Sequence, residues 1–168
     1  RVADKCLHGF TRNRDIVEGT MEVRAITEFM VRMLITWLWL ATDVAKAYDE
    51  VYRETITAVM EGLRCPEWWI KHWERSWEGV RACIRTPHGE TGWVEWRRGM
   101  VQGVRSACMH YVIVTIYMAR AITQEFPKVH QVWVADDGFF GTTLREAHEF
   151  LPFLRNTYRP IGLRIAQE

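Results

Sequence analysis

Several features that would place this 168-residue chain in a familiar class are missing. Its four cysteines lie far apart with no Cys-x-x-Cys pair, which excludes zinc-finger spacing and argues against a disulfide framework at this size. The most apolar run, from Met33 to Ala41, is far shorter than the roughly 20 residues that a membrane span needs. We therefore expect an intracellular protein with no membrane segment, nuclear and cytoplasmic locations both remaining open.

An excess of charge of one sign is also missing, because 22 Lys and Arg face 21 Asp and Glu. This balance excludes a polybasic tail, although a nucleic-acid-binding protein can still gather its positive charge on one face. The chain has no internal repeat, low-complexity tract or Gly/Ser linker, so nothing marks a domain boundary. It begins at Arg1 without a methionine, and we expect it to be a fragment.

Hydrophobic spacing and turn residues predict the order of the elements. Helical spacing predicts helices over 15–33, 50–63, 66–77 and 144–158, and composition predicts strands over 35–44, 79–85, 91–96, 129–135 and 138–141. The segment 105–126 includes Val112-Ile-Val-Thr-Ile116, which favours a strand by propensity, but its length and its spacings of three and four predict a buried helix. Strand hairpins mixed with long helices are typical of an α+β domain with a mostly antiparallel sheet packed on helices.

Three aspartates stand at the ends of strongly apolar strands. Asp43 follows Trp37-Leu-Trp-Leu-Ala-Thr42, and the pair Asp136-Asp137 follows Val132-Trp-Val-Ala135. A single aspartate there is most often a turn former or a helix cap, but adjacent carboxylates repel each other unless a cation compensates them. Three carboxylates could hold two Mg²⁺ ions roughly 3.5–4 Å apart, as in nucleotidyl transfer. One ion would lower the pKa of an attacking 3′-hydroxyl, and the other would neutralise the leaving pyrophosphate.

Five segments, in order, resemble the motifs of one family. Thr42-Asp-Val-Ala-Lys-Ala-Tyr-Asp49 resembles the first catalytic motif of reverse transcriptases of the non-LTR retrotransposon and group II intron kind, and Val134-Ala-Asp-Asp137 resembles their aromatic-Ala-Asp-Asp box. Gly99-Met-Val-Gln-Gly103 resembles their Gly-x-x-Gln-Gly motif. Gly9-Phe-Thr-Arg-Asn-Arg14 and Ile161-Gly-Leu-Arg-Ile165 resemble their Gly-Phe-x-x-Gly-Arg and Gly-Leu-x-Ile/Leu stretches. Each motif alone is weak, but five in the family's order cover nearly the whole chain.

The resemblance implies a role for each matching residue near the metal. Asp43, Asp136 and Asp137 correspond to the catalytic, metal-binding carboxylates, and the backbone carbonyl of Val44 is expected to contribute to metal binding. The implied cofactor is a pair of Mg²⁺ ions, with Mn²⁺ as a possible substitute.

The same resemblance implies contacts to nucleotides and nucleic acid. Tyr48 falls where the family keeps an aromatic that packs under the incoming sugar and rejects a 2′-hydroxyl, a core aromatic being the ordinary alternative. Gln102 and Gly103 correspond to the pair that touches the incoming nucleotide and lets the template backbone approach. Five arginines could meet phosphates, although a solvated arginine is the commoner case: Arg12, Arg14, Arg97, Arg98 and Arg105.

The expected function follows from these correspondences. Residues 1–168 would be a fragment of a reverse transcriptase domain, with about 1–33 as the fingers-to-palm connection, 34–168 as the palm, and the N-terminal fingers and the thumb absent. The expected activity is RNA-directed DNA polymerase, from a retroelement, extending a DNA or RNA primer on an RNA template from dNTPs. The isolated fragment need not be active.

Two departures from the family leave alternatives open. Val134 replaces the usual aromatic, and Ala107-Cys108 replaces the usual Ser-Pro pair, so the helix after Gly103 could start differently. One alternative is a reverse-transcriptase-like domain that has lost catalysis and serves as an RNA-binding scaffold. Another is a polymerase that makes RNA, against which Tyr48 argues, because RNA synthesis needs room for the 2′-hydroxyl.

Overall fold

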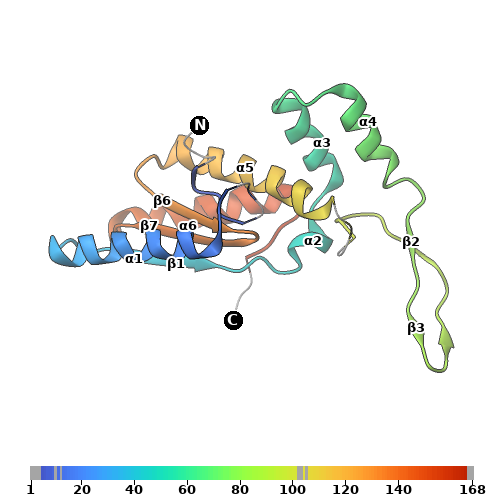
Figure 1. Cartoon of the computed structure of the whole chain (residues 1–168), viewed down its shortest axis with the longest axis horizontal. Coiled ribbons are helices and arrows are strands. Elements are labelled where there is room, and N and C mark those ends of the chain that lie inside the picture. Colours follow the sequence, from blue (N-terminus) through green and yellow to red (C-terminus); the bar gives the residue numbers. More distant parts are fainter. Residues whose placement is uncertain (1–4, 10, 12, 102–103, 105, 166–168) are drawn as a thin grey trace.

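A three-stranded antiparallel sheet lies at the centre of the fold (Figure 1). The computed structural model describes residues 5–9, 11, 13–101, 104 and 106–165. The sheet consists of β1 (Leu38–Thr42), β7 (Asp137–Thr142) and β6 (His130–Val134), in the order β1-β7-β6. The central strand, β7, is therefore hydrogen-bonded on both sides, and the predicted α+β class with an antiparallel sheet is confirmed.

Helices cover both faces of this sheet. On one face lie α5 (Ala107–Glu125) and α6 (Leu144–Tyr158), where the ring of Phe140 contacts Phe150 of α6 at a centroid distance of 5.2 Å. On the other face lies α1 (Ile16–Arg32), whose Thr27 hydroxyl accepts a hydrogen bond from Trp39 Nε1 at 2.9 Å. Successive side chains of a strand point to opposite faces, so the two faces of this one sheet meet different helices.

Helix α5 settles the one ambiguity between helix and strand. Tyr111, Val114, Met118 and Ile122 are fully buried at helical spacing, while the β-branched run at its centre belongs to the same helix. Burial of this apolar helix against the sheet therefore outweighs local strand propensity.

The predicted helix over 50–63 begins later in the structure, as α3 (Arg53–Gly62). Glu50 instead ends a separate short helix, α2 (Ala47–Glu50), and an extended residue, Val51, follows it. The Val51 carbonyl accepts a hydrogen bond from the Gly99 N–H at 2.9 Å, and the Tyr52 N–H donates to the Ile161 carbonyl at 3.0 Å. Bonds to distant segments thus replace the helical bonds, and the predicted boundary was wrong for that reason.

The segment after α3 contains a helix and a projecting ribbon. Helix α4 (Glu67–Arg75) begins after Pro66 and packs against α3. The predicted hairpin then forms as two short ladders, and its ribbon projects from the body of the molecule in Figure 1. The ladders pair β2 (Arg81–Ala82) with β5 (Val94–Glu95), and β3 (Arg85–Thr86) with β4 (Gly89–Glu90).

The last helix agrees with the prediction, whereas the first strand is shorter than predicted. Helix α6 has the predicted bounds and is followed by a 3₁₀ turn, η2 (Arg159–Ile161). Strand β1 is shorter than the predicted 35–44 because its ladder with β7 runs only from the Leu38–Thr142 pair to the Thr42–Gly138 pair. No helix in the described ranges is long and apolar enough to cross a membrane.

Replacing Phe140 with alanine tests whether the face under α5 and α6 carries the stability. Phe140 is fully buried against Trp133 and Phe150, so Phe140→Ala is expected to cost about 3–5 kcal/mol of unfolding free energy. Phe139→Ala, on the opposite face and half-buried, is the matched control and should cost clearly less. Denaturant unfolding of the complete polypeptide measures both, and equal costs would contradict this description of the core.

Candidate active site

The three predicted aspartates lie at the same end of the sheet. Val134 pairs with Asp137, so Ala135 and Asp136 are the two central residues of a tight turn joining β6 to β7. Thr42 pairs with Gly138, which places Asp43 beside Asp137 across the ladder between β1 and β7. Ala135 has a φ of 57°, a conformation that costs a non-glycine residue on the order of 1 kcal/mol and that fits the first position of a primed hairpin turn.

The charges of these carboxylates act on one another. The pKa of Asp137 is raised above its ordinary value, first by partial burial and then by the negative charges of Asp136 and Asp43. Among the described residues, however, no three Asp, Glu, His or Cys side chains are gathered closely enough to hold a metal ion. The backbone therefore brings the three aspartates to one place, while their side chains are not closed around a single point.

Val44, the residue after Asp43, is held by the last motif. It is 3 % exposed and forms an antiparallel bridge with Ile165, and the adjacent Ala45 N–H donates to the Arg164 carbonyl at 3.0 Å. This pairing fixes the backbone next to Asp43.

Tyr48 lies between a buried tyrosine and the aspartates. Its ring stacks on that of Tyr111 from α5, with centroids 4.9 Å apart and planes inclined by 29°. The pKa of Tyr48 is raised by burial, by the adjacent Cys108 thiol and by the charge of Asp136. Tyr48 is thus both a packed aromatic and a neighbour of the carboxylates, which accommodates both interpretations offered by the sequence.

The Gly99–Val101 segment, which leads to Gln102 and Gly103, is attached to α2. The Met100 N–H donates to the Tyr48 carbonyl at 2.6 Å, next to the bond from Gly99 to Val51. Gly99 has a φ of 74°, and a Cβ there would lie 2.3 Å from the Asp49 carbonyl oxygen, so only glycine fits. Gln102 and Gly103 themselves lie outside the described residues.

The segment Leu7–Gly9, which ends at the first residue of the Gly-Phe-x-x-Gly-Arg match, supports the turn that carries Asp136. Leu7 forms a parallel bridge with Trp133, and the His8 N–H donates to the Trp133 carbonyl at 2.8 Å. Gly9 then approaches so closely that a Cβ would lie 2.1 Å from the Ala135 nitrogen. The absence of a side chain at Gly9 is therefore what lets this segment pack against the turn.

Three of the five arginines predicted to contact phosphates lie within the described residues. Arg14, Arg97 and Arg98 form ion pairs with Glu18, Glu95 and Glu50 at 2.5, 3.1 and 3.0 Å. Exposed pairs of this kind contribute roughly 0–1 kcal/mol, so they leave the arginines able to exchange partners. Arg12 and Arg105 lie outside the described residues.

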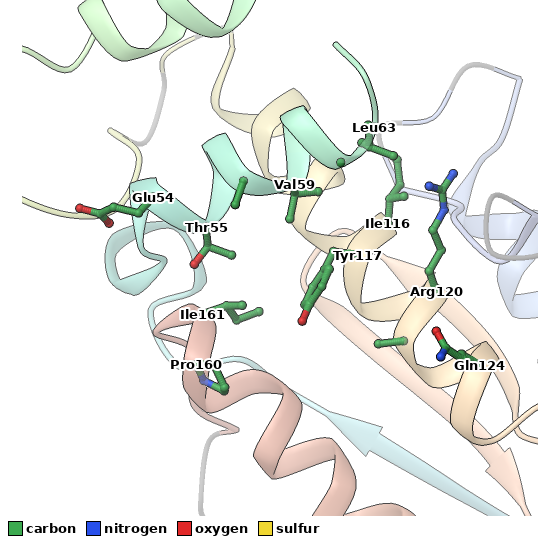
Figure 2. A pocket seen from close by; sticks show the side chains of 13 residues that line it. Glu54, Thr55, Val59, Leu63, Ile116, Tyr117, Arg120, Gln124, Pro160 and Ile161 are labelled. Atoms are coloured by element: carbon green, nitrogen blue, oxygen red, sulfur yellow. The ribbon is translucent and has the colours of Figure 1, made fainter.

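A separate apolar cavity of about 760 Å³ lies between α3, α5 and the Pro160–Ile161 turn. Figure 2 shows Tyr117 near its middle, with Glu54 at one end and Arg120 at the other. None of the three aspartates lines it. The acidic end of the sheet and this cavity are therefore different features of the molecule.

Residues 3–168 match the family model described as reverse transcriptase (RNA-dependent DNA polymerase). The chain belongs to the reverse transcriptase family. No curated protein matches this reverse transcriptase chain.

Solved structures share the fold of this reverse transcriptase chain. Telomerase from Candida albicans, in complex with a fragment of telomeric RNA, aligns with a TM-score of 0.70 at 12 % identity, covering 100 % of this chain and 33 % of that one. Apo telomerase from Candida tropicalis aligns with a TM-score of 0.68 at 10 % identity, over 97 % of this chain and 32 % of that one. The chain thus spans about a third of these neighbours, and at such identities the likeness establishes the fold alone.

Sequence reasoning missed one residue that joins two segments of the candidate site. Arg53 donates to the carbonyls of Gly99 and Trp96 at 3.1 and 2.6 Å, with its guanidinium 4.4 Å from the centre of the Trp77 ring. It thereby ties the start of α3 to the segment that leads to Gln102. No local signal distinguishes Arg53 from an ordinary helical arginine.

Adding a methyl group at Gly9 tests whether its close approach supports the turn. Gly9→Ala is expected to cost about 1–3 kcal/mol of unfolding free energy, because the new Cβ collides with backbone atoms of Ala135. Gly62→Ala is the matched control, since a Cβ there meets nothing within 4 Å. Equal thermal unfolding of the two variants would contradict the contact.

The partial burial of Asp137 and its repulsion by Asp136 and Asp43 give a pH-dependent prediction. A raised folded-state pKa means that ionised Asp137 destabilises the fold once the pH exceeds the Asp range, and that this effect is absent at lower pH. Asp137→Asn is therefore expected to raise the melting temperature at pH 7 without divalent cations, and the gain should vanish near pH 3. Thermal unfolding with chelator measures it, with Glu61→Gln on exposed α3 as control. A lower melting temperature at pH 7 would contradict the repulsion.

Proposed function

We propose that the chain is the palm of an RNA-directed DNA polymerase, which transfers nucleotides from dNTPs to a primer 3′-hydroxyl on an RNA template. The observation that carries the proposal is the convergence of Asp43, Asp136 and Asp137 at one end of the sheet in a reverse transcriptase family member. About 1–33 would connect fingers to palm and 34–168 would form the palm, with the remaining fingers and the thumb supplied by the rest of the polypeptide.

The proposed catalytic residues carry the donor chemistry that Mg²⁺ prefers. Asp43, Asp136, Asp137 and the Val44 carbonyl would supply hard oxygen ligands, and the mutual repulsion at Asp137 is what a cation would relieve. When bound, the two ions, Mg²⁺ or Mn²⁺, would activate the 3′-hydroxyl and stabilise the pyrophosphate. The protein's own contribution is to hold these carboxylates at adjoining strand ends, next to Tyr48.

Tyr48, Gln102 and Gly103 are the proposed nucleotide contacts. Tyr48 would lie under the incoming sugar, because it is packed on Tyr111 and influenced by Asp136. Gln102 and Gly103 follow directly from the segment that is hydrogen-bonded to the Tyr48 carbonyl. The five arginines Arg12, Arg14, Arg97, Arg98 and Arg105 would meet nucleic-acid phosphates.

The proposed partners are an RNA template and a DNA or RNA primer. One structural neighbour, the Candida albicans telomerase, is seen with a telomeric RNA fragment, which supports RNA as the partner class. The retroelement origin, of the non-LTR or group II intron kind, rests on the motifs in the sequence alone.

An inactive RNA-binding scaffold is the second candidate, favoured by Ala107-Cys108 in place of the Ser-Pro pair. The two candidates differ in a single measurable property, because a scaffold binds RNA without extending a primer.

Primer extension by the complete polypeptide, with RNA template, dNTPs and Mg²⁺, separates them. Asp136→Asn is expected to lower the rate about a thousandfold or more, because metal ligation supplies several kcal/mol of transition-state stabilisation. Asp15→Asn is the matched control, since asparagine caps α1 as well as aspartate does.

Two outcomes would contradict the proposal. A folded wild-type protein that binds RNA but does not extend the primer would favour the scaffold. Full activity of Asp136→Asn would contradict the proposed metal-binding role of Asp136.

A further inference from the structure

We infer that Tyr111 and Cys108 of helix α5 position the Tyr48 ring, and thereby set how strongly the site prefers deoxyribose over ribose. This inference rests on the proposed function, in which Tyr48 lies under the incoming sugar. Tyr111 and Cys108 act here as positioning residues, because neither is placed against the nucleotide itself.

The stack between Tyr48 and Tyr111 is the first support. The two ring centroids lie 4.9 Å apart and the planes are inclined by 29°, within the range of favourable aromatic pairs. Tyr111 is fully buried in the core, whereas Tyr48 is only half-buried. The rigid ring is therefore Tyr111, and the ring free to change its orientation is Tyr48.

Cys108 supplies a second contact from the same helix face. It precedes Tyr111 by three residues, a spacing that places both side chains on one side of α5. The Cys108 thiol lies near Tyr48 and contributes, after burial of the ring, to the raised pKa of that tyrosine. Helix α5 thus presents two side chains to Tyr48.

The backbone alone does not fix the Tyr48 ring. Its carbonyl accepts the Met100 N–H, which holds the main chain of α2, but the side chain keeps two rotatable torsions. Discrimination against a single 2′-oxygen requires that the ring stay in one orientation. The contacts to Tyr111 and Cys108 are the constraints on those torsions.

The buried Tyr111 hydroxyl gives the proposal a sharp control. This oxygen has no hydrogen-bond partner within the described ranges, so the ring is held by packing rather than by its hydroxyl. Tyr111→Phe keeps the stack and removes only the hydroxyl, while Tyr111→Leu removes the aromatic face.

The experiment measures sugar selectivity in the complete polypeptide. Steady-state primer extension gives kcat and KM for a dNTP and for the matching rNTP, and a dideoxy-terminated primer with Ca²⁺ gives binding of each nucleotide without turnover. The variants are Tyr111→Leu, Tyr111→Phe and Cys108→Ala. Tyr48→Ala is the positive control, and Cys83→Ala in the projecting ribbon is the matched cysteine control.

The expected result is a loss of selectivity with little loss of chemistry. Tyr111→Leu should lower the dNTP-to-rNTP ratio of kcat/KM by about tenfold, and Cys108→Ala by a few fold, both acting mainly through nucleotide binding. Tyr111→Phe should retain the wild-type ratio. If these residues had only a structural role, the variants would unfold at a lower temperature while the dNTP-to-rNTP ratio of kcat/KM stayed unchanged.

Each failure has a distinct signature. If Tyr48→Ala loses selectivity while Tyr111→Leu and Cys108→Ala both keep it, the positioning role is overturned and the proposed function stands. If Tyr111→Leu does not fold, Cys108→Ala at its half-buried site decides the matter alone. If Tyr48→Ala itself keeps the wild-type ratio, or if the wild type extends no primer, the proposed role of Tyr48 or the polymerase activity fails, and the inference falls with it.

Discussion

Backbone hydrogen bonds to a single segment, residues 42–52, hold the candidate site together. The box with Asp136-Asp137 pairs with it at Thr42, and the last motif pairs with it at Val44. The Gly-x-x-Gln-Gly segment bonds to the Tyr48 and Val51 carbonyls, and the turn after α6 bonds to Tyr52. Such bonds depend on the main chain, so segments far apart in sequence meet here with little dependence on side chains. This is why short motifs separated by long gaps converge on one place.

The same construction forces like charges together. The paired ends of β1, β6 and β7 leave the three aspartates no freedom to separate their backbones. The pKa of Asp137 is raised first by partial burial and then by the resulting repulsion. The turn adds strain at Ala135, whose φ is positive. Core packing under α5 and α6, centred on Phe140 and Trp133 of the same two strands, offsets these costs. A site that is unfavourable by itself is thus maintained by a face of the sheet that takes no part in it.

The sequence predicted the elements that depend on residues near one another in the chain. It failed where hydrogen bonds to distant segments determine the structure. Helix α6 and the end-of-strand positions of the aspartates follow from periodicity and from apolar runs, so both were predicted correctly. The break at Val51 depends on Gly99 and Ile161, which no window around Val51 contains. Arg53 and the close approach of Gly9 to Ala135 are likewise tertiary contacts. Gly9 belonged to a recognised motif, whereas nothing in the sequence around Arg53 indicated its tertiary contacts.

The departure at Ala107-Cys108 does not disturb the helix that it begins. Alanine is the best helix former, Ala107 is 3 % exposed, and its N–H donates to the Val104 carbonyl at 2.9 Å, so α5 starts with its first turn closed. The departure therefore changes side-chain chemistry beside Tyr48 rather than the fold. Replacing proline by cysteine removes a ring and introduces a thiol next to the Tyr48 hydroxyl. A loss of catalysis caused by this departure would have to arise from that local chemistry, because the helix that it begins is in place.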